Sequence, residues 1–256
     1  MLLVLDMGNT NITVGVFDGD RLLVESRLAT DFRKMEDEYA MKLADILRLY
    51  DLRREDIDGA IFSSVVPSLD RALRNAVRKV ADVTPFQVGP GIKSGINIRI
   101  DNPAQLGADL LVGAVAAVAR YGAPCLLWDL GTATKVSVID RDGAYRGGAI
   151  LPGVRTSLDS LSRAAALLPA VSIEVPPAVI GTNTVDCMAS GTVFGTASII
   201  DGMSDRIEDE LGYPATVVAT GGLAAEIVPQ CRRKIVHDPA LLLHGLRLLY
   251  QKNQKR

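Results

Sequence analysis

Two short segments of this chain combine residue types that can bind phosphate and a metal ion. Residues 2–10 and residues 126–134 each form an apolar run that ends in Asp-x-Gly, and small hydroxyl or amide residues follow the glycine. The carboxylates are Asp6 and Asp129. A carboxylate at the end of a buried strand is costly unless it meets a cation or hydrogen-bond donors. Each segment is therefore a candidate ligand site.

The residues that follow each aspartate suit the phosphate groups of a nucleotide. Gly8 and Gly131 lack the side chain that would keep a phosphate away from backbone N–H groups. Further donors stand beside these glycines: Asn9, Thr10, Thr132 and Thr134. A carboxylate oxygen is a ligand that Mg²⁺ accepts, so two such turns facing each other would hold a magnesium polyphosphate. The alternative is that each aspartate only caps a hairpin turn.

Both segments belong to a longer internal repeat. Each continues into a second apolar run, an acidic turn and a third run, so residues 2–28 and 125–151 resemble one hairpin unit used twice. The spacing of apolar residues predicts helices at 35–50, 67–80, 107–121, 154–166, 184–210 and 239–250. Short apolar runs predict strands at 60–66, 86–88, 216–219 and 234–236. We therefore expect an α/β fold with domains at 1–122 and 123–256, and a ligand in the cleft between them.

Composition excludes several classes of function. The 256 residues have a net charge of −2, which gives no basic patch for nucleic acid or an anionic membrane. The apolar stretches are too short to span a membrane, and the first residues lack the features of a signal peptide. Three well-separated cysteines indicate a reduced, cytoplasmic protein. Only two histidines are present, so a histidine metal cluster or a Ser-His-Asp triad is not expected.

Other motifs each allow a functional and a structural interpretation. Asp109 begins a predicted helix, where it is either a first-turn cap or a general base. Thr220-Gly221-Gly222 ends a predicted strand, where bare backbone suits either an adenosine or close packing. The glycines of residues 147–153 are expected at a bulge or close approach that supports the second phosphate turn. Residues 181–184 are expected to cap a helix.

The order of these motifs resembles that of the type III pantothenate kinases over nearly the whole chain. The motifs are Asp6-x-Gly8-Asn9-Thr10, Ser64-Val65-Val66-Pro67, Asn102-Pro103, Gly107-Ala108-Asp109, Asp129-Leu130-Gly131-Thr132-Ala133-Thr134, Gly147-Gly148, Pro152-Gly153, Gly181-x-Asn183-Thr184 and Thr220-Gly221-Gly222. That family belongs to the superfamily of acetate and sugar kinases, heat-shock chaperone ATPases and actin.

The resemblance implies a fold, a reaction and partners. It implies two ribonuclease H-like domains related by internal duplication. It also implies that ATP phosphorylates pantothenate to 4'-phosphopantothenate in the first step of coenzyme A synthesis. The implied ions are Mg²⁺ and a monovalent cation (K⁺ or NH4⁺), and the implied assembly is a homodimer with the acceptor site near the subunit interface.

The resemblance also assigns residues to roles. It places the ATP phosphates on Asp6, Met7, Gly8, Asn9, Thr10, Asn11, Ile12 and Thr13 and on Gly131, Thr132 and Thr134, and the adenosine on Gly221 and Gly222. Asp109 resembles the base that deprotonates the acceptor hydroxyl. The residues that correspond to the family's acceptor contacts are Ile100, Gly107, Ala108, Asp109, Leu110 and Thr184. Asp129 resembles the ligand of the monovalent cation, and Asp6 that of Mg²⁺ held through the nucleotide.

Three positions depart from the family pattern. Leu110 stands where the family usually has an arginine that can bind a carboxylate through two hydrogen bonds. Ile100 replaces an aromatic residue, and Lys135 replaces a threonine after the second phosphate motif. Lys135 is a point charge that can bind phosphate or block it. Because two departures fall in the acceptor site, two alternatives stay open: an impaired or non-catalytic nucleotide-binding paralogue, and a kinase for a different small acceptor.

Overall fold

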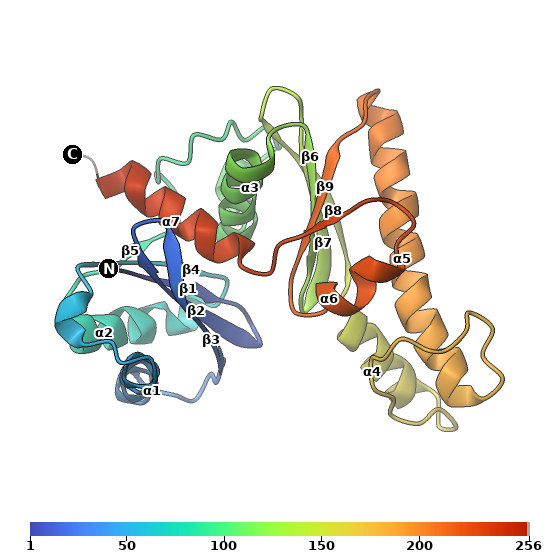
Figure 1. Cartoon of the computed structure of the whole chain (residues 1–256), viewed down its shortest axis with the longest axis horizontal. Helices are drawn as coiled ribbons and strands as arrows, with labels where there is room; N and C mark the ends of the chain where they lie inside the picture. The colour runs from blue at the N-terminus through green and yellow to red at the C-terminus, as the bar shows by residue number, and fades with distance from the viewer. Residues whose placement is uncertain (255–256) are drawn as a thin grey trace. The chain divides into compact units, whose positions relative to one another are not determined.

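The structure is a computed structural model that describes residues 1–254, and it divides the chain into two compact units (Figure 1). The first unit contains Met1–Ile96, Asn102–Ala116 and the C-terminal residues from Ala240 onwards. The second contains Asn97–Asp101 and Ala117–Pro239. The predicted boundary lies between residues 122 and 123. This division differs from it, because the last helix belongs to the first unit and residues 97–101 and 117–122 belong to the second.

The first unit is built on a five-stranded sheet with the order β3-β2-β1-β4-β5. The strands are β1 (Leu2–Met7), β2 (Asn11–Asp18), β3 (Arg21–Ala29), β4 (Gly59–Ser64) and β5 (Phe86–Gln87). β2 runs antiparallel to β1 and β3, whereas β1, β4 and β5 are parallel. Strand β1 is therefore the central strand, with β2 on one side and β4 on the other.

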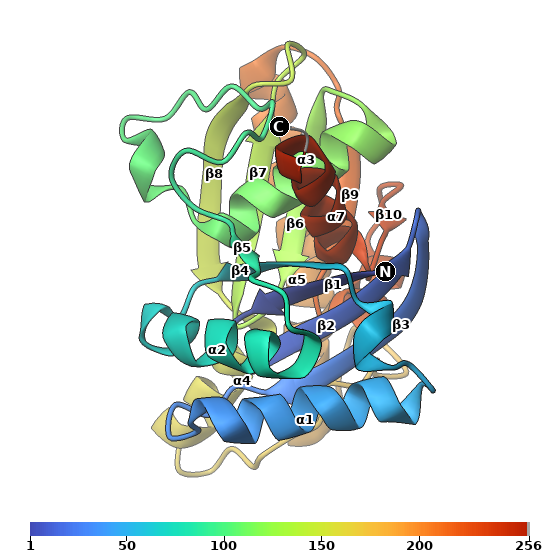
Figure 2. The ribbon, with the colours of Figure 1, turned by 90° about the vertical axis from the view of Figure 1, so that its left-hand side faces the viewer.

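Helices cover the first sheet. Helices α1 (Glu36–Leu49) and α2 (Asp70–Ala81) lie side by side against one face (Figure 2). Leu3 and Leu5 point into this core, while the alternate residue Val4 lies beside Gly15, near Leu243 of helix α7 (Leu241–Gln254). α7 belongs to the first unit because Tyr250 covers Gly59 so closely that a Cβ there would lie 1.9 Å from the phenol oxygen.

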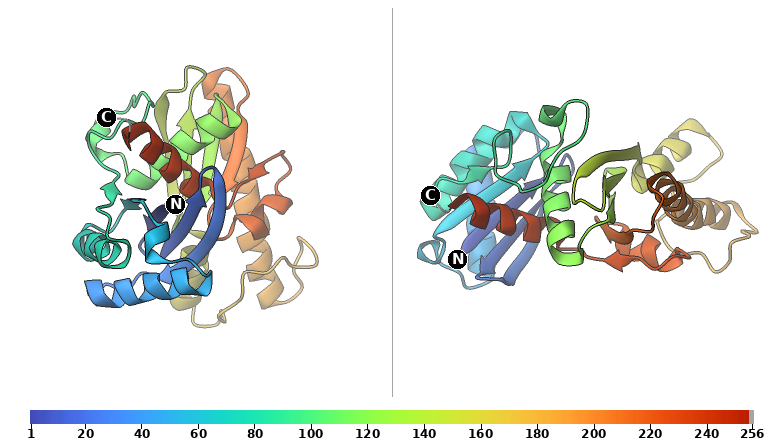
Figure 3. Two further views of the ribbon diagram at one scale, coloured as in Figure 1. Left: turned by 60° about the vertical axis from the view of Figure 1, so that its left-hand side comes forward. Right: turned by 90° about the horizontal axis from the view of Figure 1, so that it is seen from above.

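The second unit repeats this plan with the sheet order β10-β9-β6-β7-β8. The strands are β6 (Cys125–Leu130), β7 (Ala133–Ile139), β8 (Tyr145–Pro152), β9 (Thr216–Thr220) and β10 (Val236–His237). The helices are α4 (Val154–Ala164), α5 (Thr184–Leu211) and α6 (Ala224–Ile227), and the long α5 packs against this sheet (Figure 3). Helix α3 (Ala108–Tyr121) contributes residues to both units.

The two sheets are copies of one topology. Read from the third strand of each hairpin unit, the orders β3-β2-β1-β4-β5 and β8-β7-β6-β9-β10 coincide, and so do the strand directions. Each copy also has an irregularity at the same place, between Val16 and Phe17 on β2 and between Val138 and Ile139 on β7. The predicted α/β fold, with a ribonuclease H-like unit duplicated within the chain, is confirmed.

Most predicted elements are present, and several of their ends differ from expectation by a few residues. The helix expected from residue 67 begins with a 3-10 turn at Pro67–Leu69 before α2, and α7 continues to Gln254 rather than ending near residue 250. Three further 3-10 turns occur at Arg54–Asp56, Pro103–Gln105 and Val228–Gln230. No helix within residues 1–254 has the length and apolar character needed to cross a membrane.

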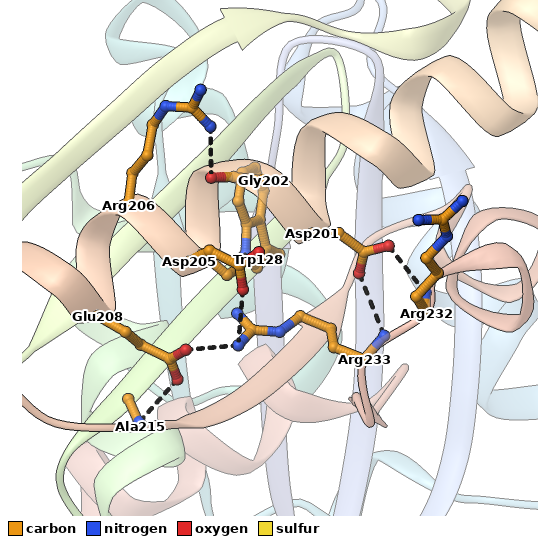
Figure 4. Close-up of polar contacts among 10 residues, drawn as sticks. Trp128, Asp201, Gly202, Asp205, Arg206, Glu208, Ala215, Arg232 and Arg233 are labelled. Carbon is orange, nitrogen blue, oxygen red and sulfur yellow. Dashed lines mark hydrogen bonds and ion pairs between the residues drawn. The ribbon is translucent and has the colours of Figure 1, made fainter.

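Polar side chains fix helix α5 to the second sheet beside the predicted phosphate turn. Trp128 of β6 is fully buried and donates its Nε1–H to Ser204 Oγ at 3.0 Å. Asp201 accepts the backbone N–H groups of Arg232 and Arg233, and the Arg233 guanidinium donates to Glu208 Oε2 at 2.5 Å (Figure 4). These contacts hold the segment before β10 on α5 and anchor the strand residue that precedes Asp129.

Candidate active site

Asp6 is held by a hydrogen bond from a neighbouring parallel strand. The register of β1 places it opposite Thr13 on β2 and opposite Ser63 on β4. Ser63 is fully buried, and its Oγ donates to Asp6 Oδ1 at 2.6 Å. A hydrogen bond to a carboxylate is short and strong, so Ser63 fixes the orientation of this acid. The sequence carries no signal for Ser63, because only the parallel pairing of β1 and β4 shows which serine lies beside Asp6.

The turn after β1 presents polar groups on a fixed backbone. The Gly8 N–H donates to the Asn11 carbonyl at 2.9 Å. Thr30 holds the turn from β3's end, since its Oγ1 donates to the Gly8 carbonyl at 2.7 Å and its N–H donates to the Thr10 carbonyl at 2.9 Å. Asn9, Thr10 and Asn11 are exposed. Met7 and Ile12 are core residues with no exposed surface, so the exposed residues between them are better placed to contact a phosphate.

Asp129 occupies the equivalent place in the second unit. It lies opposite Lys135 on β7 and opposite Thr220 on β9, so Thr220 stands where Ser63 stands in the first unit. The Lys135 Nζ lies 3.0 Å from Asp129 Oδ2, and the two side chains are 18% and 21% exposed. In the turn that follows, Thr132 is exposed, whereas Thr134 is 3% exposed and its hydroxyl is buried. Thr132 is therefore the better placed of these two hydroxyls to contact a phosphate.

The glycines of residues 147–153 lie at close backbone approaches, as their sequence predicted, and Gly153, just after β8, packs on the second turn. A Cβ at Gly153 would lie 2.2 Å from the Thr132 carbonyl oxygen, and Thr156 donates its hydroxyl to the same oxygen at 3.1 Å. A Cβ at Gly148 would lie 1.7 Å from the Val136 carbonyl oxygen, and Gly147 has a φ of +117°. Close backbone packing accounts for Gly148 and Gly153, and a positive φ accounts for Gly147.

Gly221 packs directly on the strand that carries Asp129. Its φ is +98°, and a Cβ there would lie 2.6 Å from the Leu130 backbone nitrogen. This close approach accounts for the first glycine of the Thr-Gly-Gly motif. Gly222 is exposed. An adenosine contact at Gly221 and Gly222 stays a prediction.

Asp109 lies in the first turn of α3, where the helix dipole favours a negative charge. It is half-buried, and its Oδ1 accepts the Leu110 N–H at 2.9 Å. A Cβ at Gly107 would lie 2.6 Å from that same oxygen, so glycine leaves the space that the carboxylate occupies. The arrangement is compatible with both a first-turn cap and a base.

The predicted acceptor residues are divided between the units. Gly107, Ala108, Asp109 and Leu110 lie in the first unit, whereas Ile100 and Thr184 lie in the second. Thr184 is the first residue of α5, after Asn183, whose side chain accepts the Asp186 N–H at 3.0 Å as the predicted helix cap. Thr184 also lines a groove of about 850 Å³ between α4 and α5. Contact of these residues with pantothenate, and the cleft expected between the domains, stay predictions.

The residues present fit one of the two expected cations. Mg²⁺ is commonly held by one or two carboxylates together with substrate phosphates, and Asp6 offers such a carboxylate at a strand end. Residues 1–254 contain no group of three or more His, Cys, Asp or Glu side chains arranged to hold a metal ion. At Asp129, however, the Lys135 ammonium lies at ion-pair distance, in the place where the resemblance expects a monovalent cation.

The duplicated ribonuclease H-like fold, with an Asp-x-Gly turn after the first strand of each copy, defines the structural class of this protein. Solved structures with the same fold include a Campylobacter jejuni protein assigned to the Baf family of transcriptional activators (TM-score 0.61, 19% identity, 99% of this chain and 100% of that chain). A second is component A of the (R)-2-hydroxyglutaryl-CoA dehydratase of Acidaminococcus fermentans (TM-score 0.55, 17% identity, 96% and 94% covered).

Sequence comparison narrows this class to one family. The family model for type III pantothenate kinases matches residues 2–206. Curated relatives with that name come from Exiguobacterium sibiricum, with 44% identity over 254 residues (99% of this chain, 100% of the relative), and from Moorella thermoacetica, with 42% identity over 253 residues (99% and 100%). This chain belongs to the type III pantothenate kinase family.

Proposed function

We propose that this protein transfers the γ-phosphoryl group of ATP to the hydroxyl of pantothenate and forms 4'-phosphopantothenate, the first step of coenzyme A synthesis. The observation that carries this proposal is the match to relatives named type III pantothenate kinase over the whole length of both chains. The two Asp-x-Gly turns at equivalent positions of the duplicated fold support it, because phosphoryl transfer depends mainly on positioning and charge stabilisation.

In this proposal the two turns bind the phosphates of ATP. The exposed side chains of Asn9, Thr10 and Thr132 are the donors, because the N–H groups of Gly8 and Gly131 already donate within their own turns. Asp6 and the phosphate oxygens would hold Mg²⁺, which neutralises the charge of the transferred group when bound. The Ser63 hydroxyl, 2.6 Å from Asp6 Oδ1, orients the carboxylate toward that task.

Asp109 is the base in this proposal. Its half-buried carboxylate stands at the start of α3 beside the apolar Leu110. A carboxylate positioned within hydrogen-bond reach of a hydroxyl can take its proton as the phosphoryl group transfers. Gly107, Ala108, Leu110, Ile100 and Thr184 would contact the rest of the acceptor.

A homodimer is part of the proposal, and the groove between α4 and α5 supports it. Large apolar side chains are exposed on this groove and on the loop before it, including Ile180 at 83%, Leu161 at 46% and Ile199 at 43%. Apolar surface of this kind marks an interaction site. Ile199→Glu should therefore shift the mass measured by light scattering from dimer to monomer, whereas Leu49→Glu, an exposed leucine on α1, should not.

A coupled assay for ADP with pantothenate, ATP, Mg²⁺ and KCl tests the proposed reaction. ADP formation that depends on pantothenate supports it, and mass spectrometry should then detect 4'-phosphopantothenate. ATP binding without any transfer would favour a non-catalytic paralogue, and transfer only to another small alcohol would favour a kinase for that acceptor. In the latter two cases, activity gained by Leu110→Arg with Ile100→Tyr would assign the loss to the acceptor site. The cytoplasmic location expected from the sequence stays a prediction. The three cysteines form no disulfide bond.

A further inference from the structure

The ion pair between Lys135 and Asp129 is built into the hairpin that carries the second phosphate turn. The register of β6 and β7 places the two residues directly opposite each other, one pair inward from Leu130 and Thr134. The Lys135 Nζ lies 3.0 Å from Asp129 Oδ2, and both side chains are about four-fifths buried. Solvent screens a partly buried pair less than an exposed one, so this ammonium stays next to the carboxylate.

The first copy of the hairpin shows that the fold does not require a lysine at this position. There the residue opposite Asp6 is Thr13, in the same register. The strand order, the strand directions and the irregularity in the second strand are the same in both copies. A neutral hydroxyl is therefore sufficient to form this hairpin, and the positive charge of Lys135 is a property of the second copy alone.

The Asp129 carboxylate lies between the Lys135 ammonium and the turn at Gly131. Its Oδ2 faces Lys135, whereas its Oδ1 lies 3.5 Å from the position that a Cβ of Gly131 would take. A free monovalent cation on Asp129 would compete with the ammonium for the carboxylate and would be repelled by it. The residues present therefore do not fit the monovalent cation that the resemblance places at Asp129.

We propose that Lys135 replaces this cation with a tethered one, so that the enzyme works without added K⁺ or NH4⁺. Lys135 is a positioning residue: its ammonium neutralises Asp129 and fixes the carboxylate beside Gly131, where the second turn binds phosphate. This inference rests on the proposed kinase function. It assigns to one side chain the task that a diffusible ion would otherwise perform.

The first test compares salts at equal ionic strength. Turnover of the wild-type protein with saturating ATP, Mg²⁺ and pantothenate should agree within about twofold in N-methyl-D-glucamine chloride, NaCl and KCl, since the tethered ammonium makes the diffusible cation redundant. Lys135→Thr, which restores the residue type found opposite Asp6, should lose about tenfold or more in N-methyl-D-glucamine chloride and regain activity in KCl. Lys234→Thr, at an exposed lysine of the second unit, is the matched control and should behave like the wild type.

A second test has a readout independent of activity. Crystals soaked in RbCl should show an anomalous Rb⁺ peak beside Asp129 in Lys135→Thr and none there in the wild type. Wild-type turnover that rises about tenfold on replacing N-methyl-D-glucamine with K⁺, or a Rb⁺ ion bound to Asp129 in the wild type, would overturn the inference. A wild-type protein that phosphorylates nothing in any salt would refute the proposed function instead, and the Rb⁺ comparison would still decide the role of Lys135.

Discussion

The Ser63 hydroxyl on β4 donates a hydrogen bond to the Asp6 carboxylate on the parallel strand β1, with Oγ 2.6 Å from Oδ1. The two residues are 57 positions apart in the chain. Thr220 occupies the same place beside Asp129 in the second sheet, so both copies put a hydroxyl residue next to the acid. This arrangement leads to the first prediction.

Ser63→Ala should lower both stability and turnover. It removes a hydrogen bond to a charged group at a fully buried site, which costs about 1.5–3 kcal/mol of unfolding free energy. The released carboxylate should also raise the KM for ATP. Ser63→Thr should retain most of the activity, because threonine is the residue that the second copy uses at this register. Urea unfolding and steady-state kinetics measure the two effects, and equal ATP kinetics in Ser63→Ala and the wild type would remove Ser63 from the site.

Asp109→Asn should reduce kcat by about 10²–10⁴-fold, the effect typical of losing a general base. The asparagine oxygen can still accept the Leu110 N–H, so the melting temperature should stay close to that of the wild type. Asp18→Asn, at an exposed aspartate in the same unit, serves as the control. Undiminished turnover in Asp109→Asn would leave the carboxylate as a first-turn cap only.

Gly153→Ala should displace the backbone of the second phosphate turn. The added methyl group would lie 2.2 Å from the Thr132 carbonyl oxygen and 2.6 Å from that of Gly131, so the backbone of the turn must move. We expect a rise in the KM for ATP with a smaller change in the KM for pantothenate. Gly89→Ala is the matched control, because a Cβ there meets nothing within 4 Å. Similar ATP kinetics in the two variants would contradict this role of Gly153.

Asp140 should make the second unit sensitive to acid. Burial by itself raises the pKa of Asp140, but the N–H groups of Ala144 and Asp142 and the guanidinium groups of Arg146 and Arg99 favour the ionised form more, so the pKa lies below its ordinary value. A depressed folded-state pKa contributes stability at pH values above the unfolded pKa, and this contribution is lost as the pH falls through the folded pKa.

The corresponding variant, Asp140→Asn, should be less stable than the wild type by about 1–3 kcal/mol at pH 7, because the buried N–H groups lose a charged acceptor. Its unfolding free energy should also fall less steeply below pH 4 than that of the wild type. Denaturant titrations between pH 7 and pH 2 measure this difference. Asp159→Asn, at an exposed aspartate on α4, should keep the wild-type profile. Parallel profiles for Asp140→Asn and the wild type would refute the assignment.

The sequence by itself determined the repeated hairpins, the helices that follow them and the carboxylate at each turn. These features depend on residues close together in the chain: period-two apolar runs make strands, glycines and acidic residues end them, and the order of the short motifs indicated the family. The pairing of Lys135 with Asp129, at 3.0 Å, was not predicted from the sequence and comes from the structure.

Only the tertiary structure decided which distant residues meet these motifs. Ser63 reaches Asp6 through a parallel strand, Gly221 packs on the Leu130 backbone, and Tyr250 on α7 covers Gly59 of the first sheet. Sequence spacing carries no signal for such pairs, because the pairing of parallel strands and the docking of a terminal helix depend on how the whole unit buries its apolar surface. The physical reason is that local conformational preferences are a property of neighbouring residues, whereas the environment of a buried carboxylate is a property of the packed core.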